Sequence, residues 1–269
     1  MTDTQASNTF GKESGHWYDR TGTLVETVPY ADPRKGHRQT TLRDARKRGD
    51  LAPGVTTIIG MANKPQLVTW KMKQAALAAL TCPRQPDENE DAWLARVLEV
   101  DANEHARDAA DEGTRIHAAI EQHFRRETYD DSYRPHVEGV LGCLELLGPQ
   151  EWQPEKGAAH PFGFGTKADL HSDEWVVDFK GKDGDDEALA RLTTWDDHHM
   201  QLAATRQAMG VPGARAAICY VSRTHPGAAA LFEVTQAQLT KGWECFRCLL
   251  AFWQAKNNYR PNWAVQVTL

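Results

Sequence analysis

The stretch GFGTKADLHSDEWVVDFKGKDG, residues 163–184, predicts two β-strands joined by a tight turn. Alternate side chains of a strand share a face, so the second strand has one apolar face that predicts a core. This face consists of Trp175, Val177 and Phe179. The opposite face carries Asp178 and Lys180, a carboxylate and an ammonium that the packing of the strand does not need.

Asp169 of the first strand is expected to lie close to Asp178 if the two strands form a hairpin. Lys167 shares the face of Asp169, and Gly163 and Gly165 allow close approach of another backbone segment. Two carboxylates and a lysine around one point suit a hard cation such as Mg²⁺ and a water molecule that it activates. An Asp-x-Lys pair alone is more often a surface salt bridge, so the metal hypothesis depends on further motifs.

The composition is that of a globular protein. The 269 residues are 41% hydrophobic and 25% charged, which is enough for a buried core as one large domain or as a core with an arm. The net charge of −6 argues against indiscriminate coating of nucleic acid but allows a local basic groove. No apolar run is long enough to span a membrane, and the first 16 residues lack a signal-peptide pattern, so a cytoplasmic protein with five reduced cysteines and no membrane partner is expected.

Three regions are predicted along the chain. Residues 1–16 are polar and are expected to form a disordered tail. Residues 17–100 are expected to form an N-terminal arm and helical region, and residues 101–269 the core. Within the arm, Val55–Ile59 could be a strand or a helix entry, and Leu67–Leu80 predicts a helix that Pro65 starts.

Helices are predicted on both sides of the strand pair. The segment EGTRIHAAIEQHF places His117 and Glu121 four residues apart on one helix face, where they could bind a metal or form surface hydrogen bonds. A later helix begins near Asp196 and carries Gln201. Its first turn, with Asp197, His198 and His199, is expected to cap the helix and face solvent. Helices over Tyr133–Leu147 and Gln236–Asn258 and strands over Ala216–Val221 and Ala229–Val234 complete the predicted pattern.

The segment RKGHRQTTLRDARKR, residues 34–48, is strongly basic, with seven Lys or Arg against one Asp. A solvated charged face is the ordinary explanation of such a run. Beside a centre that cleaves phosphodiesters, the same run becomes a candidate arm for phosphate contacts. The candidate DNA-binding residues are Arg34, Lys35, Arg38, Arg43, Arg46, Lys47 and Arg48.

Five fragments, in this order, resemble motifs of the PD-(D/E)XK nuclease superfamily, and within it the RecB-type and phage exonuclease-like branch. The fragments are GVTTIIGMANKPQLVTW, GTRIHAAIE, GTKAD, VVDFK and HMQLAAT, and the resemblance runs from about Val55 to Tyr259. Two positions depart from the family pattern, because Thr205 stands where the family has a tyrosine and Gly181 where it has a threonine.

The resemblance implies an α/β protein with a restriction-endonuclease-like core, a mixed β-sheet flanked by helices, and a helical N-terminal part. It implies Mg²⁺ or Mn²⁺, with His117, Asp169, Asp178 and the backbone carbonyl of Phe179 as ligands. Lys180 would orient the attacking water, Glu121 would bind a second ion or its water shell, and Gln201 would position Lys180 or the scissile strand. Some family members carry an iron–sulfur cluster on four cysteines. Cys82, Cys245 and Cys248 do not match that pattern, so no cluster is expected.

The function that the resemblance implies is a divalent-metal-dependent DNA exonuclease. It would hydrolyse phosphodiester bonds of linear DNA to leave 5′-phosphates, in phage or bacterial recombination or in DNA-end processing, in the host cytoplasm if the gene belongs to a phage. Two alternatives stay open: a structure-specific or nicking endonuclease on the same core, and a non-catalytic DNA-binding scaffold. The scaffold is disfavoured because it has no need of clustered carboxylates that repel one another. Duplex DNA ends are the expected partner, and a single-strand annealing protein and a second copy of the chain are further candidates.

Overall fold

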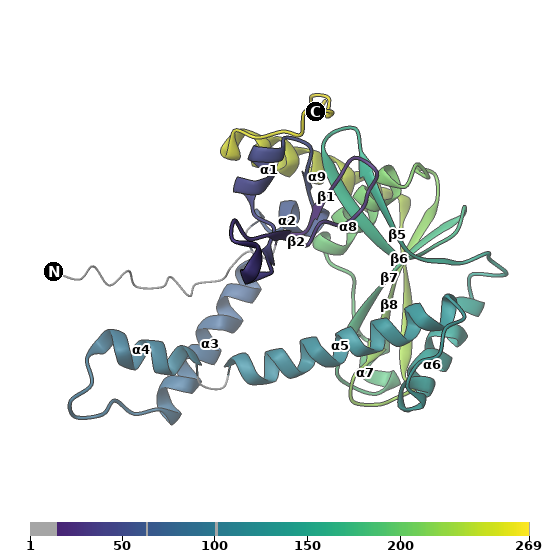
Figure 1. Cartoon of the computed structure of the whole chain (residues 1–269). Helices are drawn as coiled ribbons and strands as arrows, with labels where there is room; N and C mark the ends of the chain where they lie inside the picture. Colours follow the sequence, from purple (N-terminus) through teal and green to yellow (C-terminus); the bar gives the residue numbers. More distant parts are fainter. Residues whose placement is uncertain (1–14, 63, 100–101, 269) are drawn as a thin grey trace.

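A five-stranded mixed sheet lies between two layers of helices (Figure 1). The computed structural model describes residues 15–62, 64–99 and 102–268, so residues 1–14 of the predicted tail lie outside the described part. The strands, in their order across the sheet, are β5 (Gln153–His160), β6 (Phe164–His171), β7 (Trp175–Lys182), β8 (Arg215–Ser222) and β9 (Ala229–Val234). The prediction of an α/β protein with a mixed sheet and flanking helices is therefore confirmed.

The sheet is mixed because β7 and β8 run parallel, whereas every other neighbouring pair is antiparallel. A parallel pair needs a crossover connection. Here α7 (Asp186–Ala190) and α8 (Asp196–Ala208) supply it, and α8 crosses the sheet beside β6 and β7. This crossover brings Gln201 to the strands that carry Asp169 and Asp178.

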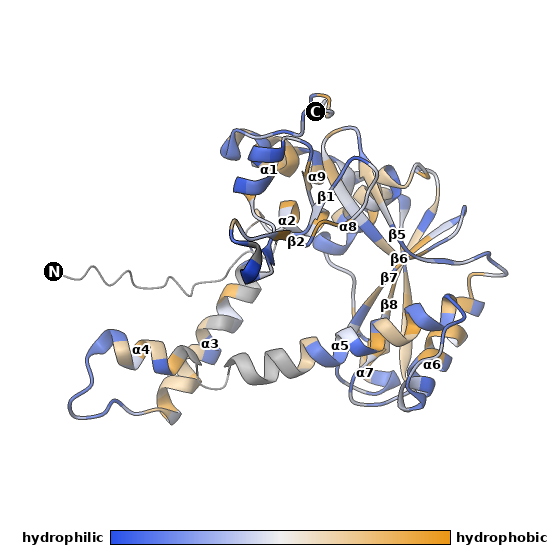
Figure 2. Ribbon diagram, viewed as in Figure 1, coloured by the Kyte–Doolittle hydropathy of each residue, from blue (hydrophilic) through white to orange (hydrophobic). Residues whose placement is uncertain are grey.

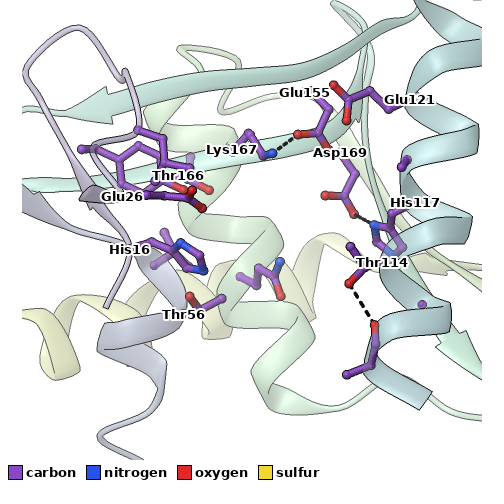
Figure 3. A pocket seen from close by; sticks show the side chains of 17 residues that line it. His16, Glu26, Thr56, Thr114, His117, Glu121, Glu155, Thr166, Lys167 and Asp169 are labelled. Carbon is purple, nitrogen blue, oxygen red and sulfur yellow. Dashed lines mark hydrogen bonds and ion pairs between the residues drawn. The ribbon is translucent and has the colours of Figure 1, made fainter. Parts of the chain in front are cut away.

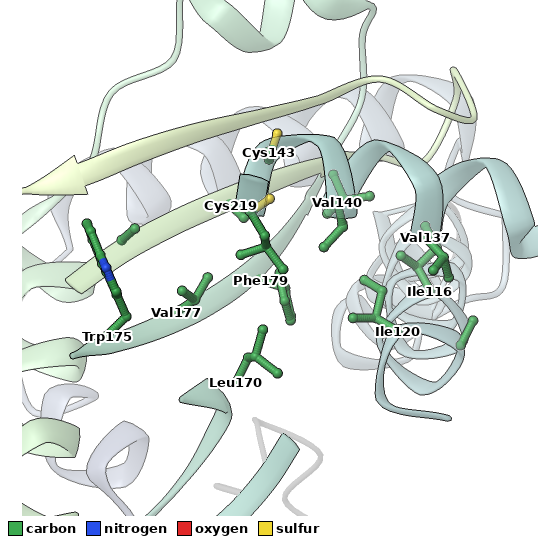
Figure 4. Packing of buried hydrophobic residues seen from close by; sticks show 14 residues of the cluster. Ile116, Ile120, Val137, Val140, Cys143, Leu170, Trp175, Val177, Phe179 and Cys219 are labelled. Carbon is green, nitrogen blue, oxygen red and sulfur yellow. The ribbon is translucent and has the colours of Figure 1, made fainter. Parts of the chain in front are cut away.

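One face of the sheet is covered by α5 (Ala102–Phe124) and α6 (Arg134–Glu145) (Figure 4). The predicted core face of β7 is confirmed, because Trp175, Val177 and Phe179 are buried beneath these helices. Ile116 and Ile120 of α5, one turn apart, pack into the same cluster. Their spacing turns the neighbouring face of α5, which carries His117 and Glu121, toward the end of the strands.

The other face is covered by α8 and α9 (Gln236–Asn257). The N-terminal segments join this side: β1 (Trp17–Tyr18) pairs with β4 (Ala52–Pro53), and α1 (Leu42–Arg48) and α2 (Val55–Ile59) follow around them. One hydrophobic cluster unites both parts of the chain, and it includes Trp17, Leu51, Ile58, Phe164, Phe246 and Trp253. The division at residue 100 stays a prediction, but residues 17–59 share a core with the C-terminal half.

The remaining N-terminal elements lie around and away from this core. A hairpin of β2 (Thr27–Pro29) and β3 (His37–Gln39) is connected through a short 3-10 helix, Pro33–Lys35, and a second 3-10 helix, Asp131–Tyr133, precedes α6. The helices α3 (Pro65–Thr81) and α4 (Glu90–Glu99) extend away from the sheet at the lower left of Figure 1. In Figure 2, α1 is mostly hydrophilic, as its basic sequence requires.

Several local predictions can be compared with the structure. The ambiguous segment Val55–Ile59 is a helix, and the predicted strand Ala229–Val234 has the same bounds in the structure. The expectation that His199 faces solvent is wrong: the side chain is buried, and its Nε2 lies 2.8 Å from the hydroxyl of Thr194. No helix in the described part of the chain is long and apolar enough to cross a membrane.

Candidate active site

The strands β6 and β7 separate at the two predicted carboxylates. Their backbone pairing covers His171 with Val176 and Leu170 with Val177, next to the turn. The next pair in this register would be Asp169 with Asp178, and there the ladder stops. The N–H of Phe179 donates instead to Oδ2 of Asp169 at 2.9 Å, so a side chain replaces the missing backbone acceptor. The predicted hairpin thus brings Asp169 and Asp178 to one place.

Asp178 is the centre of a closed set of polar contacts. The amide Nε2 of Gln201 donates to Oδ1 of Asp178 at 2.5 Å, and Nζ of Lys180 lies 2.7 Å from Oδ2. Nζ of Lys180 also donates to Oε1 of Gln201 at 3.3 Å. Burial lowers the pKa of Lys180, but attraction to Asp178 and Asp169 outweighs burial, so the net shift is upward. The ammonium therefore stays charged beside the carboxylate.

His117 of α5 approaches Asp169 from the face of the sheet opposite to that of Gln201. Its Nδ1 lies 3.7 Å from Oδ2 of Asp169 (Figure 3). Its ring stands edge-on to that of Phe179, with 6.0 Å between ring centroids. Burial lowers the pKa of His117, although the nearby charge of Asp178 and a hydrogen bond to the backbone of Phe179 oppose the shift. At neutral pH the imidazole is therefore neutral, the form that can bind a metal.

Asp169 ionises with difficulty in this environment. Burial, followed by repulsion from Asp178, raises its pKa to about 8, against an opposing effect of Lys180. A nearby carboxylate makes a carboxyl group harder to ionise. A bound cation would offset this repulsion and favour the ionised form of Asp169.

A cavity of about 570 Å³, here called the Asp169 cavity, opens beside these residues (Figure 3). The helix α5 contributes His117 and Glu121 to its wall, and α8 contributes Gln201. Asp178 and Lys180 lie outside the lining. Gln201 connects them to the cavity, because it lines the cavity and contacts both residues.

The N-terminal segment forms another wall of the Asp169 cavity. A parallel bridge joins Gly54 to Gly165 of β6, and the ring of Tyr18 lies directly over Gly165. A Cβ atom at Gly165 would lie within 2.3 Å of the Tyr18 side chain, so only glycine fits there. The predicted close approach of backbone at this strand is confirmed by the bridge from Gly54, and the Tyr18 side chain packs against the same glycine.

Glu155 is a site residue that sequence reasoning missed. It occupies the register position opposite Asp169 on β5, lines the Asp169 cavity, and forms an ion pair with Lys167 (Figure 3). Its φ of 53° is in the left-handed region, which is costly for a residue other than glycine and is often found at functional sites. One glutamate in a polar strand gave no signal of this. A charged residue of β5 facing Lys167 could have been sought once the hairpin was predicted.

Two further residues of the predicted motifs have clear structural contacts. Glu121 lines the Asp169 cavity and is paired with Arg125, with 2.6 Å between Oε1 and Nη2. Thr205, which replaces the family tyrosine, is buried, and its hydroxyl lies 2.9 Å from that of Thr166. Thr205 thus connects α8 to β6 and does not face the cavity.

The predicted DNA-binding segment carries less free charge than its composition suggests. Carboxylates hold Arg34, Arg38 and Arg48, as these arginines pair with Asp32, Asp44 and Asp50, respectively. Arg46 donates to the backbone carbonyl of Asn257. In the described part of the chain, no ion-pair partner is found for four basic residues of this segment, so these supply the uncompensated charge: Lys35, Arg43, Arg46 and Lys47.

The donor atoms of the site fit a hard divalent cation in their chemistry. His117 and Asp169 face each other, and Oδ2 of Asp178 is buried, with Nζ of Lys180 2.7 Å away. Carboxylate oxygens, with an imidazole, are suitable ligands for Mg²⁺ or Mn²⁺. Within residues 15–62, 64–99 and 102–268, however, no three His, Cys, Asp or Glu side chains form a group that could hold a metal as they stand. A complete set therefore needs the Asp178 carboxylate, which Gln201 and Lys180 hold.

Comparison with known proteins assigns no family to this chain. No protein-family model matches the chain, and no curated protein matches it. A solved structure described as "Crystal structure of SSO0001" is similar over 42% of this chain and 59% of that chain, with 17% identity and a TM-score of 0.25. The chain thus matches less than two thirds of that structure, and a similarity of this size supports no conclusion about fold or function.

Proposed function

We propose that this protein is a divalent-metal-dependent deoxyribonuclease, and specifically an exonuclease that leaves 5′-phosphates on linear DNA. The observation that carries the proposal is the meeting of Asp169, Asp178 and Lys180 where β6 and β7 separate, with His117 and Gln201 arriving from opposite faces of the sheet. Such a set has no packing role, since two carboxylates that repel one another destabilise an unliganded fold.

The ligands of the cation would be His117, Asp169, Asp178 and the backbone carbonyl of Phe179. When bound, a divalent cation lowers the pKa of a coordinated water and polarises a phosphoryl oxygen. Glu121 would contribute to a second ion or its water shell from the wall of the Asp169 cavity.

Lys180 would act on the phosphate directly. Its ammonium remains charged, so it can orient the attacking water and neutralise charge that develops on the attacked phosphate. Gln201 restricts the position of that ammonium through Oε1 and holds Asp178 through Nε2. The shared contact makes Gln201 a positioning residue, because it fixes the carboxylate and the ammonium relative to each other.

The test is the incubation of linear and covalently closed circular duplex DNA with the purified protein and Mg²⁺. The proposed exonuclease degrades only the linear form and releases products that carry a 5′-phosphate. Loss of the circular form would show the endonuclease instead. Binding of DNA without cleavage of either form, in Mg²⁺ or Mn²⁺, would show the non-catalytic scaffold.

A further inference from the structure

A second cavity, of about 840 Å³, adjoins the Asp169 cavity. The same N-terminal segments separate the two, and consecutive residues along these segments line opposite cavities. His16, Tyr18, Glu26 and Thr56 line the Asp169 cavity, whereas Gly15, Trp17, Thr27 and Thr57 line the second cavity. The wall between the cavities is therefore one chain segment thick. It consists of residues of β1, β2 and α2 and the residues just before β1 and β2; Figure 1 shows these elements.

The linings of the two cavities differ in charge. Four carboxylates line the Asp169 cavity, namely Glu26, Glu121, Glu155 and Asp169. Among the described residues that line the second cavity, none is Asp or Glu, and three are basic: His37, Arg38 and Lys256. Asp44 holds Arg38 through two hydrogen bonds of 2.6 and 2.7 Å, but Lys256 has no ion-pair partner in the described part of the chain. The second cavity therefore favours an anion.

Two threonines that line the second cavity have buried hydroxyl groups without partners among the described residues. Thr40 is only 5% exposed, and its Oγ1 makes no hydrogen bond to any described residue. The Oγ1 of Thr57, across the cavity wall from the Asp169 site, is also buried and unpartnered within the described chain. A buried hydroxyl without a partner is costly, and most buried polar groups in proteins are satisfied. Two such groups in one cavity are suited to a polar ligand.

Aromatic rings complete the second cavity. Tyr30 is 40% exposed and presents its ring at the lining, where a flat group can stack on it. Trp17 and Trp253 also line the cavity, and their rings stand edge-on to each other with 6.1 Å between centroids. Nucleic-acid bases stack on such rings with little preference for sequence, while nearby cations hold the phosphate.

We propose that the second cavity binds a nucleotide, with its base on Tyr30, its phosphate near Lys256 and its polar atoms on Thr40 and Thr57. The nucleotide is either free or one unit of a DNA strand that passes the wall of the Asp169 cavity. The inference rests on the proposed nuclease function only where the nucleotide is a unit of a DNA strand. The residues of the site are separate from Asp178 and Lys180, so binding here is measurable whether or not the protein cleaves DNA.

The test is calorimetric titration of the full chain, in EDTA, with dAMP, deoxyadenosine, inorganic phosphate and a 5′-phosphorylated hexathymidylate. We expect dAMP or the hexanucleotide to bind more tightly than deoxyadenosine or phosphate alone, because both the ring and the cation are engaged. Tyr30→Ala and Lys256→Gln should each weaken binding by roughly tenfold, and Thr40→Val by a smaller factor. The matched control is Lys241→Gln, an exposed lysine on the same helix, which should leave the affinity unchanged.

The different probes of the titration distinguish a free nucleotide from a unit of a DNA strand. Binding of dAMP that the cavity variants lose indicates a free nucleotide, whereas binding of the hexanucleotide alone indicates a unit of a DNA strand. Lys180→Ala should retain the affinity of the parent protein. The proposal is overturned if Tyr30→Ala and Lys256→Gln, shown by circular dichroism to be folded, bind both probes as the Lys241→Gln control does. Loss of binding in Lys180→Ala but not in the cavity variants would place the nucleotide beside Asp178 and Lys180 and equally overturn the proposal.

Discussion

Replacement of Asp169 by asparagine removes a carboxyl group that is difficult to ionise in the metal-free fold. In the folded protein the pKa of Asp169 is about 8, compared with an ordinary value of 3.8. Between about pH 4 and pH 8, Asp169 therefore keeps its proton in the folded state but has released it in the unfolded state. The contribution of Asp169 to stability is greatest below about pH 4 and declines as the pH rises to about 8. Asparagine retains an oxygen that can accept the hydrogen bond from the N–H of Phe179.

The expected size of the effect follows from that shift. One pKa unit corresponds to about 1.4 kcal/mol, so the full shift amounts to on the order of 5 kcal/mol at pH 8. The Asp169 side chain is 18% exposed, which screens part of this energy. We therefore expect Asp169→Asn to unfold with a free energy about 2–5 kcal/mol greater than the parent at pH 8, and with little difference near pH 4.

The assay is urea denaturation in EDTA at several pH values between 4.5 and 8.5, followed by tryptophan fluorescence. Asp173→Asn is the matched control, because Asp173 is exposed in the turn of the same hairpin. It should show no stabilisation that grows with pH. If Asp169→Asn is less stable than the parent at pH 8, or if the difference does not change with pH, the inference that burial and the nearby Asp178 oppose the ionisation of Asp169 is incorrect.

Three further predictions concern separate parts of the molecule. His117→Ala should reduce turnover and raise the metal requirement far more than His198→Ala, whereas His199→Ala should reduce stability because His199 is buried against Thr194. Steady-state rates at several Mg²⁺ concentrations and thermal melts measure these effects. Equal rate losses at all three positions would refute the assignment of His117 to the metal site. Arg43→Ala combined with Lys47→Ala should flatten the dependence of DNA affinity on salt by about 0.9 per lost phosphate contact, with a smaller change for Arg48→Ala, which Asp50 already neutralises; an unchanged slope in the double variant would place the DNA elsewhere. Glu155→Gly and Glu155→Gln should both lower cleavage, but the glycine variant should be about 1 kcal/mol more stable in urea because glycine accepts a positive φ; no difference between the two would argue against strain at this position.

The strand pair was predictable from the sequence because its side chains alternate so clearly. The apolar set of Trp175, Val177 and Phe179 required one buried face, and the turn then placed Asp169 near Asp178. The helices were predictable from their periodicity, which set Ile116 and Ile120 toward the sheet and left His117 beside the strand ends. Regular geometry connects sequence to position in each of these cases.

Other parts of the site depend on contacts that no periodicity encodes. The pairing of Arg38 with Asp44 is a choice of side-chain conformations, so the basic run alone could not show how much charge is free. The place of Tyr18 over Gly165 comes from the packing of segments almost 150 positions apart in the chain. Glu155 acquires its place through a local backbone conformation that is unusual for glutamate.

The most direct measurement of the central claim is the release of nucleotides from end-labelled linear duplex DNA by the parent protein and by Lys180→Ala. Lys241→Ala serves as a control for the loss of one exposed positive charge. We expect release by the parent and by Lys241→Ala in Mg²⁺, none in EDTA, and none by a folded Lys180→Ala that still binds the DNA. Cleavage by Lys180→Ala at the parent rate, or undiminished cleavage in EDTA, would contradict the proposed metal-dependent mechanism.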